Sequence, residues 1–172
     1  MFRKWKFILL LLVSSLLLTA CGQTLEEQVH AGIEAARNTF TAGPKEQTAE
    51  IDGIQLYKPA GYVIAENSDA QNIVFTKNDE TFILFINPNE ENDSRLFFDL
   101  LKADTSKEII ESQTFTDNGL FGFAAVVESG EDEIELIASV GGAKMTTMAN
   151  KKKIEENLTK MMEIVRSIKE KS

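Results

Sequence analysis

The N-terminal part of the chain begins with a short apolar run. Residues 7–18 are apolar apart from two serines, and Arg3, Lys4 and Lys6 precede them. A basic segment followed by a short apolar segment is typical of a secretory signal peptide, and this run falls short of the ~20 apolar residues that a transmembrane helix needs. We therefore expect residues 1–20 to be a leader that is removed on export.

A helix is expected soon after the leader. Thr24 and Glu27 have capping-box spacing, in which the two side chains satisfy free backbone N–H groups at a helix start. Apolar residues then recur at spacings of three and four as far as Phe40, which predicts an amphipathic helix. Residues 41–44, Thr-Ala-Gly-Pro, should end this helix, and residues 45–50 are polar enough to form a linker.

From residue 51 onward the pattern changes to short β-rich segments separated by turn residues. Asn78-Asp79-Glu80, Asp117-Asn118-Gly119 and Gly141-Gly142 are turn sequences, so strands that are neighbours in sequence should pair antiparallel. Residues 82–86 and 120–127 are apolar without alternation, which predicts strands covered on both sides and helices on more than one face of the sheet. Strands are expected at residues 54–57, 62–65, 71–77, 81–87, 111–116, 120–128, 133–140 and 144–148.

Two more helices are expected within this region. Asp93 or Ser94 can cap one that carries Leu96, Phe97, Leu100 and Leu101. Asn150 can cap a longer one with a single apolar stripe formed by Ile154, Leu158, Met161, Met162, Val165 and Ile168. The predicted fold class is α+β: a mostly antiparallel sheet of six or seven strands with helices packed on its faces. Residues 21–50 are expected to be the processed N-terminus, helix and linker, and residues 51–172 a single domain.

Leu18-Thr19-Ala20-Cys21 resembles the lipobox of bacterial lipoproteins. The resemblance implies that Cys21 receives a diacylglyceryl thioether and becomes the new N-terminus, so that acyl chains on Cys21 attach the protein to the extracytoplasmic face of a cell membrane. Two alternatives remain, a secreted protein with one free thiol and an uncleaved N-terminal anchor helix. The cleavage site looks like that of a Gram-positive lipoprotein, whereas in a Gram-negative host Gly22 is compatible with transport to the outer membrane.

A second resemblance concerns the order of elements from residue 51 on. A strand, Pro59-Ala60-Gly61-Tyr62, a hairpin, a helix, a four-strand meander and a C-terminal helix resemble the PsbP-like fold, to which DcrB-type envelope lipoproteins also belong. The resemblance implies a non-catalytic binding or assembly module. Tyr62 stands where such domains often carry a tryptophan, and no functional residue can be carried over by position.

The charge and the cysteine content of the sequence exclude some classes of partner and cofactor. The chain has 18 basic and 27 acidic residues, a formal charge of −9, and removal of Arg3, Lys4 and Lys6 with the leader takes it to −12. This balance repels nucleic acid and anionic lipid headgroups, so we expect no nucleic-acid partner. Cys21 is the only cysteine, and no disulfide or cysteine metal cluster is therefore expected in the mature chain.

The sequence contains few candidates for chemistry. His30 is the only histidine, and no Gly-x-Ser-x-Gly elbow accompanies it. Gly141-Gly142-Ala143-Lys144 lacks the spacing of a phosphate-binding loop. The acidic residues at 128–135 and the oxygen-rich loop at 87–93 contain ligand types for Ca²⁺ but no EF-hand pattern, and solvated turns explain them as well. Of the methionines Met145, Met148, Met161 and Met162, which suggest a soft-metal or flexible binding surface, the last two fit core packing better.

No catalytic, cofactor-binding or metal-binding residue is therefore predicted, and Cys21 is the one predicted site, a lipidation site. The leading hypothesis is a lipid-anchored envelope module that binds another envelope protein or a small ligand without catalysis. The alternative is a small envelope hydrolase that uses Asp or Glu as acid and base, since such carboxylates meet only in the fold. A third interpretation is a stress or sporulation protein with a mechanical role at the membrane.

Overall fold

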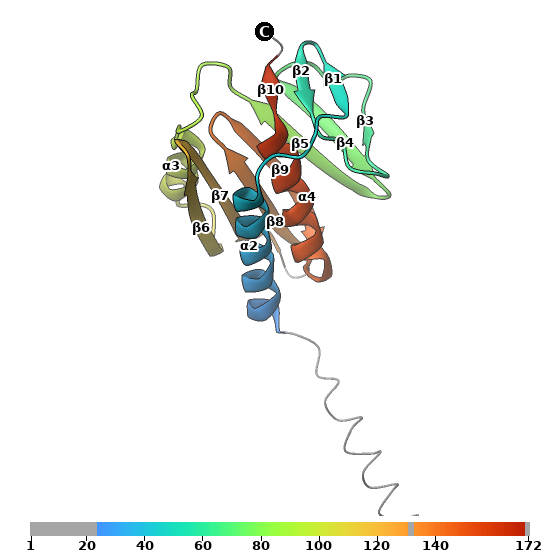
Figure 1. Cartoon of the computed structure of the whole chain (residues 1–172). Helices are drawn as coiled ribbons and strands as arrows, with labels where there is room; N and C mark the ends of the chain where they lie inside the picture. Colours follow the sequence, from blue (N-terminus) through green and yellow to red (C-terminus); the bar gives the residue numbers. More distant parts are fainter. Residues whose placement is uncertain (1–23, 131–132, 171–172) are drawn as a thin grey trace, which may run out of the picture.

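The computed structural model describes residues 24–130 and 133–170. Within them, a seven-stranded sheet runs in the order β3-β4-β5-β9-β8-β7-β6, and every pair of neighbours is antiparallel (Figure 1). The predicted α+β class is confirmed. The strands are β3 (Val63–Ile64), β4 (Asn72–Lys77), β5 (Glu80–Ile86), β6 (Ile109–Asp117), β7 (Leu120–Glu128), β8 (Glu133–Val140) and β9 (Ala143–Asn150).

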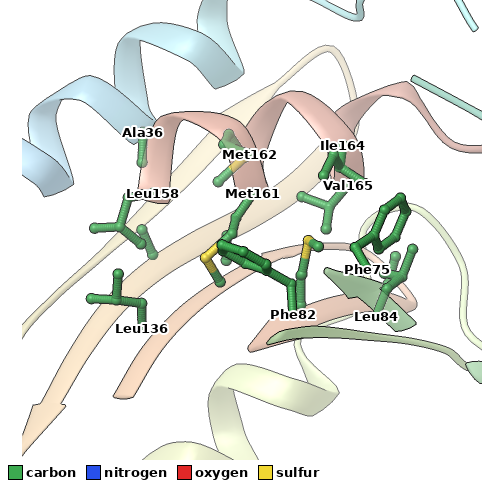
Figure 2. Close-up of a cluster of buried hydrophobic side chains, with 14 of the residues drawn as sticks. Ala36, Phe75, Phe82, Leu84, Leu136, Leu158, Met161, Met162, Ile164 and Val165 are labelled. Atoms are coloured by element: carbon green, nitrogen blue, oxygen red, sulfur yellow. The ribbon is translucent and has the colours of Figure 1, made fainter. Parts of the chain in front are cut away.

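Two parallel helices cover one face of this sheet. They are α2 (Leu25–Ala42) and α4 (Ile154–Ser167), and a short 3-10 turn, η2 (Lys151–Lys153), leads into α4. The predicted stripe of α4 points toward the strands, where Met161, Met162 and Leu158 are fully buried beside Phe75, Phe82 and Leu136 (Figure 2). Burial of large apolar side chains contributes about 1.5–3 kcal/mol each, so this layer is the main source of stability.

The N-terminal helix belongs to this core. The Thr24–Glu27 capping box is present in full, and the helix continues to Ala42, where Gly43 takes a positive φ of 90°. Val29, Ile33, Ala36 and Phe40 are buried in the same cluster as the α4 stripe. The segment before residue 51 is therefore packed on the domain rather than separated from it.

The third helix, α3 (Leu96–Ala103), lies on the opposite face. Its Phe97 and Leu101 form a second cluster with Phe121, Phe123, Ala125, Val127 and Ile137. The N-cap residue is Arg95, which makes no capping hydrogen bond through its side chain, so the predicted cap at Asp93 or Ser94 was wrong by one residue or more. The Ser94 hydroxyl still accepts a hydrogen bond from Leu96 N at 3.2 Å. Helices on both faces were expected from the apolar run at residues 120–127, and β7 is indeed covered on both sides, with every residue from Phe121 to Val127 buried.

The same prediction was wrong for residues 82–86. In β5 the buried residues Phe82, Leu84 and Ile86 alternate with Ile83 and Phe85, which are exposed. The strand is thus covered on one face only, although both faces are apolar. The absence of polar residues indicated two apolar faces, but it did not show that both faces were covered.

A small second sheet closes the end of the molecule beyond the C-terminal end of α4. Its strands are β1 (Ala49–Ile51), β2 (Ile54–Leu56) and β10 (Lys169–Glu170), in the order β1-β2-β10. The first of these strands includes residues that were expected to be linker, and the last was not predicted. Within residues 24–130 and 133–170, no helix combines the length and apolarity that crossing a bilayer requires.

Candidate functional site: the open half of the main sheet

The α3 helix covers only part of its face of the main sheet. Its buried cluster is formed with β7 and β8, and only Phe97 at its start reaches Phe85 on β5 and Lys144 on β9. Most of the same face of β4, β5 and β9 is therefore left without a covering helix. Cross-strand pairs such as Val74 with Ile83, and Ile83 with Thr146, place one set of side chains on this face. We call this set the open half: Asn72, Val74, Thr76, Thr81, Ile83, Phe85, Lys144, Thr146 and Met148.

The open half contains three exposed large apolar side chains and little charge. Ile83 is 49% exposed, Met148 45% and Phe85 36%. None of the nine residues is acidic and Lys144 is the only cation, although the whole chain carries 27 acidic residues. Depletion of charge around exposed large apolar side chains is typical of the central part of a protein interface.

A groove runs between the open half and the flank of α3. One hollow of about 120 Å³ is lined by apolar side chains that include Phe97, Leu100 and Ile137. Its lining also contains four charged residues: Asp104, Lys107, Glu135 and Lys144. A second hollow of about 360 Å³ shares Glu135 and continues over Ile83 and Met148. Leu100 is 57% exposed, so the helix wall of the groove is apolar as well.

The two ends of the groove differ in charge. At one end Lys144 is half-buried, and its Nζ lies 5.1 Å from the centre of the Phe97 ring. Burial lowers the pKa of the Lys144 amine. The negative charge of Glu135 raises this pKa, and the positive charge of Lys107 lowers it further. Lys107 and Glu135 form an ion pair between the two hollows. At the other end the lining includes Asp79 and Glu133.

The two ends are fixed by the strand register. Phe85 pairs with Lys144 and with Asn72, which forms the row at the cationic end. Thr81 pairs with Thr76 and lines the second hollow with Met148 and Asp79, which forms the row at the acidic end. The groove therefore runs along the strands from a basic to an acidic end.

A separate cleft of about 470 Å³ lies where the C-terminal end of α4 meets the loop after β5. Two of the charged groups in its lining, Arg166 and Glu90, already have protein partners. Arg166 Nε donates to the Phe40 carbonyl oxygen at 3.3 Å and its Nη2 lies 3.7 Å from Asp117 Oδ2, and the Ser94 hydroxyl donates to the Glu90 carboxylate. This cleft is therefore a weaker candidate than the groove.

The sequence candidates are scattered over the molecule. Cys21 lies outside the described residues. His30 is exposed on α2, with Nδ1 3.2 Å from Glu111 Oε1. Gly141 and Gly142 form the turn between β8 and β9, as predicted, and are packed against the loop at residues 87–92.

The oxygen-rich segments have mostly local partners. Asn87 Oδ1 accepts from the backbone N of Asn89 at 3.1 Å, and Glu135 is paired with Lys107. Glu131 and Asp132 of the acidic hairpin lie outside the described residues. In the part of the chain that the structure describes, no group of three or more His, Cys, Asp or Glu is placed to hold a metal ion.

The methionines divide between core and surface. Met145, Met161 and Met162 are fully buried, whereas Met148 is exposed on the open half. Sequence reasoning associated Met148 with a flexible binding surface but did not connect it with Ile83 or Phe85. The signal that could have found the open half is the pairing of β5 with β9, which joins segments about sixty residues apart and which hydrophobic period alone does not specify.

No protein-family model matches the chain, and no curated protein is similar to it in sequence. Among solved structures, the solution structure of cyanobacterial PsbP (CyanoP) from Synechocystis sp. PCC 6803 is similar at a TM-score of 0.42 and 13% sequence identity, over 73% of this chain and 91% of that chain. The α+β class is established by the sheet and its helices themselves.

Proposed function

We propose that this chain is a lipid-anchored, extracytoplasmic module of the cell envelope that binds another envelope protein and does not catalyse a reaction. The observation that carries the proposal is the open half, where Ile83, Phe85 and Met148 are exposed on an uncovered sheet face. Asp79, Glu133 and Glu135 border this patch but are not part of it. The occupant is a protein surface with matching apolar side chains, because burial of Ile83, Phe85 and Met148 needs a partner that excludes water.

The N-terminal sequence supports the anchor. The basic and apolar leader and the Leu18-Thr19-Ala20-Cys21 pattern both lie immediately before the folded domain. Each buried methylene of an acyl chain contributes about 0.8 kcal/mol, so one chain binds a bilayer marginally and two bind it stably. Thr24, where the α2 cap begins, is only three residues from Cys21, a span of at most about 11 Å. Acylation would therefore hold the N-terminal end of α2 close to the bilayer.

The open half also weighs against the hydrolase alternative. The second hollow brings Asp79, Glu133 and Glu135 to one lining, which is the observation in favour of acid–base chemistry. However, Glu135 is paired with Lys107, and the hollow lies on an open sheet face rather than in a deep apolar pocket. A binding surface accounts for the exposed apolar residues, whereas a carboxylate pair leaves them unexplained.

The anchor is tested by labelling cells with palmitate. The wild-type chain should incorporate label and remain with the membrane. The Cys21→Ser variant should lose the label and either leave the membrane or keep its leader, because no other thiol is present. Label retained on Cys21→Ser would contradict the anchor.

The binding role is tested by affinity purification from detergent-solubilised membranes. Ile83→Lys places a charge in the centre of the open half and should abolish recovery of the partner. Asn38→Lys adds the same charge to an exposed position on α2, on the other face of the sheet, and should leave recovery unchanged. Equal recovery with both variants would contradict a role for the open half.

A further inference from the structure

We propose that the occupant of the open half is an amphipathic helix of the partner protein, which lies beside α3 and runs antiparallel to it. This inference rests on the proposed function and names the element that the partner inserts. It follows from the size of the open half, from the neighbouring helix and from the charges at the two ends of the groove.

The size of the open half matches one helix. Neighbouring strands lie about 4.8 Å apart, so three strands present a width of about 10–14 Å, and a helix with its side chains is about 10–12 Å across. The rows at the two ends are four residues apart on β5, Thr81 to Phe85, which is about 14 Å or roughly nine residues of helix. The helix already on this face, α3, has 8 residues.

The same size disfavours a second copy of the chain. The open half covers roughly 200 Å² of sheet, by strand spacing and rise, whereas a standard interface buries about 800 Å² on each partner. Two flat open halves placed face to face would therefore fall well short of a stable dimer. The segment at residues 131–132, between the described parts of the chain, is too short to supply the helix.

The neighbouring helix shows how the site would be filled. On β7 and β8, α3 places Phe97 and Leu101 onto the sheet, and the Phe85 and Phe97 rings meet edge-to-face with centroids 5.9 Å apart. Leu100 is left exposed on the groove side. A second helix beside α3 would cover Leu100 with its flank and Ile83, Phe85 and Met148 with its apolar stripe, which is the helix-in-groove form of recognition.

The charges set the direction. Lys144 lies at the end of the groove where α3 begins, because Phe97, the second residue of α3, contacts both Lys144 and Phe85. Asp79 and Glu133 lie at the other end. A helix has a partial positive charge at its N-terminus and a partial negative charge at its C-terminus. The partner's N-terminal end therefore belongs beside Asp79 and Glu133 and its C-terminal end beside Lys144, which makes it antiparallel to α3.

The test is photocrosslinking of the full-length, membrane-bound protein. A benzophenone amino acid replaces Thr81 in one variant and Phe85 in another, and Asn38 in a control, and the crosslinked residues of the partner are mapped by mass spectrometry. The Thr81 probe should label the N-terminal part of one partner segment and the Phe85 probe its C-terminal part, roughly nine residues later. Repeated sites should be spaced by three or four residues, and the Asn38 probe should not label this segment.

A charge in the groove provides a second measurement. Ile83→Lys should lower the crosslink yield of the Phe85 probe at least about tenfold, the change expected from loss of a central contact, and Asn38→Lys should leave it unchanged. Ile83 is already half exposed, and a thermal unfolding curve would verify that the variant remains folded.

The outcomes separate the two proposals. Labelling of a strand or loop, or the reverse order of labelled sites, would overturn the antiparallel helix but leave the binding function standing. Labelling of a second copy of this chain or of lipid would overturn the partner helix as well. No labelling above the Asn38 control from either open-half probe would overturn both proposals.

Discussion

Gly122 on β7 lies at the tightest contact between α2 and the sheet. A methyl group at this position would lie 2.7 Å from the Phe40 ring and 2.9 Å from the carbonyl oxygen of Ser139 on the neighbouring strand. The ring can shift, but the carbonyl is held in the β7–β8 ladder, in which Gly122 pairs with Val140. Only glycine fits here without moving a strand.

We predict that Gly122→Ala lowers the free energy of unfolding by about 1–3 kcal/mol, the usual cost of overpacking a core. Gly32→Ala is the matched control. Its added methyl group would meet Cγ2 of Ile154 at 2.6 Å and Cδ1 of Leu158 at 3.2 Å, which are side-chain atoms and not a backbone carbonyl of a strand. Alanine also favours helix by about 1 kcal/mol over glycine, which offsets part of the overpacking cost. Urea denaturation should give the larger loss for Gly122→Ala, and equal losses would contradict the role of the Ser139 carbonyl.

Burial of Lys144 should make the stability of the protein depend on pH. Its burial lowers the pKa of the amine below the ordinary 10.5, with Glu135 opposing this shift and Lys107 adding to it. In the unfolded chain the amine keeps its proton up to 10.5, so between the lowered pKa and 10.5 the unfolded state binds more protons than the folded state. Stability attributable to Lys144 therefore rises with pH through this interval.

The prediction is a pH-dependent difference from Lys144→Met. The variant should be more stable than the wild type near pH 7, and the difference should shrink as the pH rises toward 10.5. Urea midpoints of the two proteins at several pH values would measure it. A difference that does not change with pH would show that burial does not perturb this amine.

At the scale of elements, the capping box fixes where α2 begins. Thr24 Oγ1 accepts from Glu27 N at 3.2 Å and Thr24 N donates to Glu27 Oε2 at 2.9 Å. The apolar side chains of α2 pack in the same core cluster as those of α4. Fraying of the first turn of α2 therefore weakens packing in the main core.

Thr24→Ala should therefore cost about 1 kcal/mol of unfolding free energy, the usual value of an N-cap. Thr41→Ala is the control at the other end of α2, where the hydroxyl only donates to the carbonyl oxygen of Arg37 at 2.9 Å, a bond of little value to a helix. Chemical denaturation of both variants tests the difference, and equal effects would contradict a stabilising cap.

The elements also show what the sequence could predict. Capping box, apolar stripes and turn residues located α2, α4 and most strands, since each is a local pattern. β7 and β8 were predicted to the residue. β1 and β10 were missed because Ala49–Ile51 and Lys169–Glu170 are short and contain charged residues, so they lack the apolar segments that marked β2 and β3. The candidate site was missed for a different reason: the open half is created by the pairing of β5 with β9 and by the short reach of α3, and neither is encoded locally.

At the scale of the molecule, the two ends of α2 mark two opposite ends of the domain. The helix has 18 residues, about 27 Å. Its N-terminal end is the one adjacent to Cys21, and Pro44 at its other end lines the same cleft as Asn87, Pro88 and Glu90. With Cys21 acylated, the loop at residues 87–92 should face away from the bilayer.

A spin label on Glu26→Cys should then be relaxed strongly by gadolinium-chelating lipids, and one on Asn89→Cys should be relaxed much less. Both positions are exposed, and with Cys21 acylated the introduced thiol would be the only free one, because Cys21 is the single cysteine in the sequence. Electron paramagnetic resonance in reconstituted vesicles would measure the difference. Equal relaxation at the two positions would contradict the orientation.

Because α2 begins at Leu25, only four residues after Cys21, an acyl anchor would limit which partners the domain can bind. Three residues between an acylated thiol and a helix locked into the core leave almost no tether. The protein would explore the envelope by lateral diffusion at a nearly constant height, and the effective concentration of any binding surface would be set in two dimensions. Partners whose binding surface lies at a similar distance from the bilayer would be favoured. Partners whose binding surface lies much farther from the bilayer would not be bound.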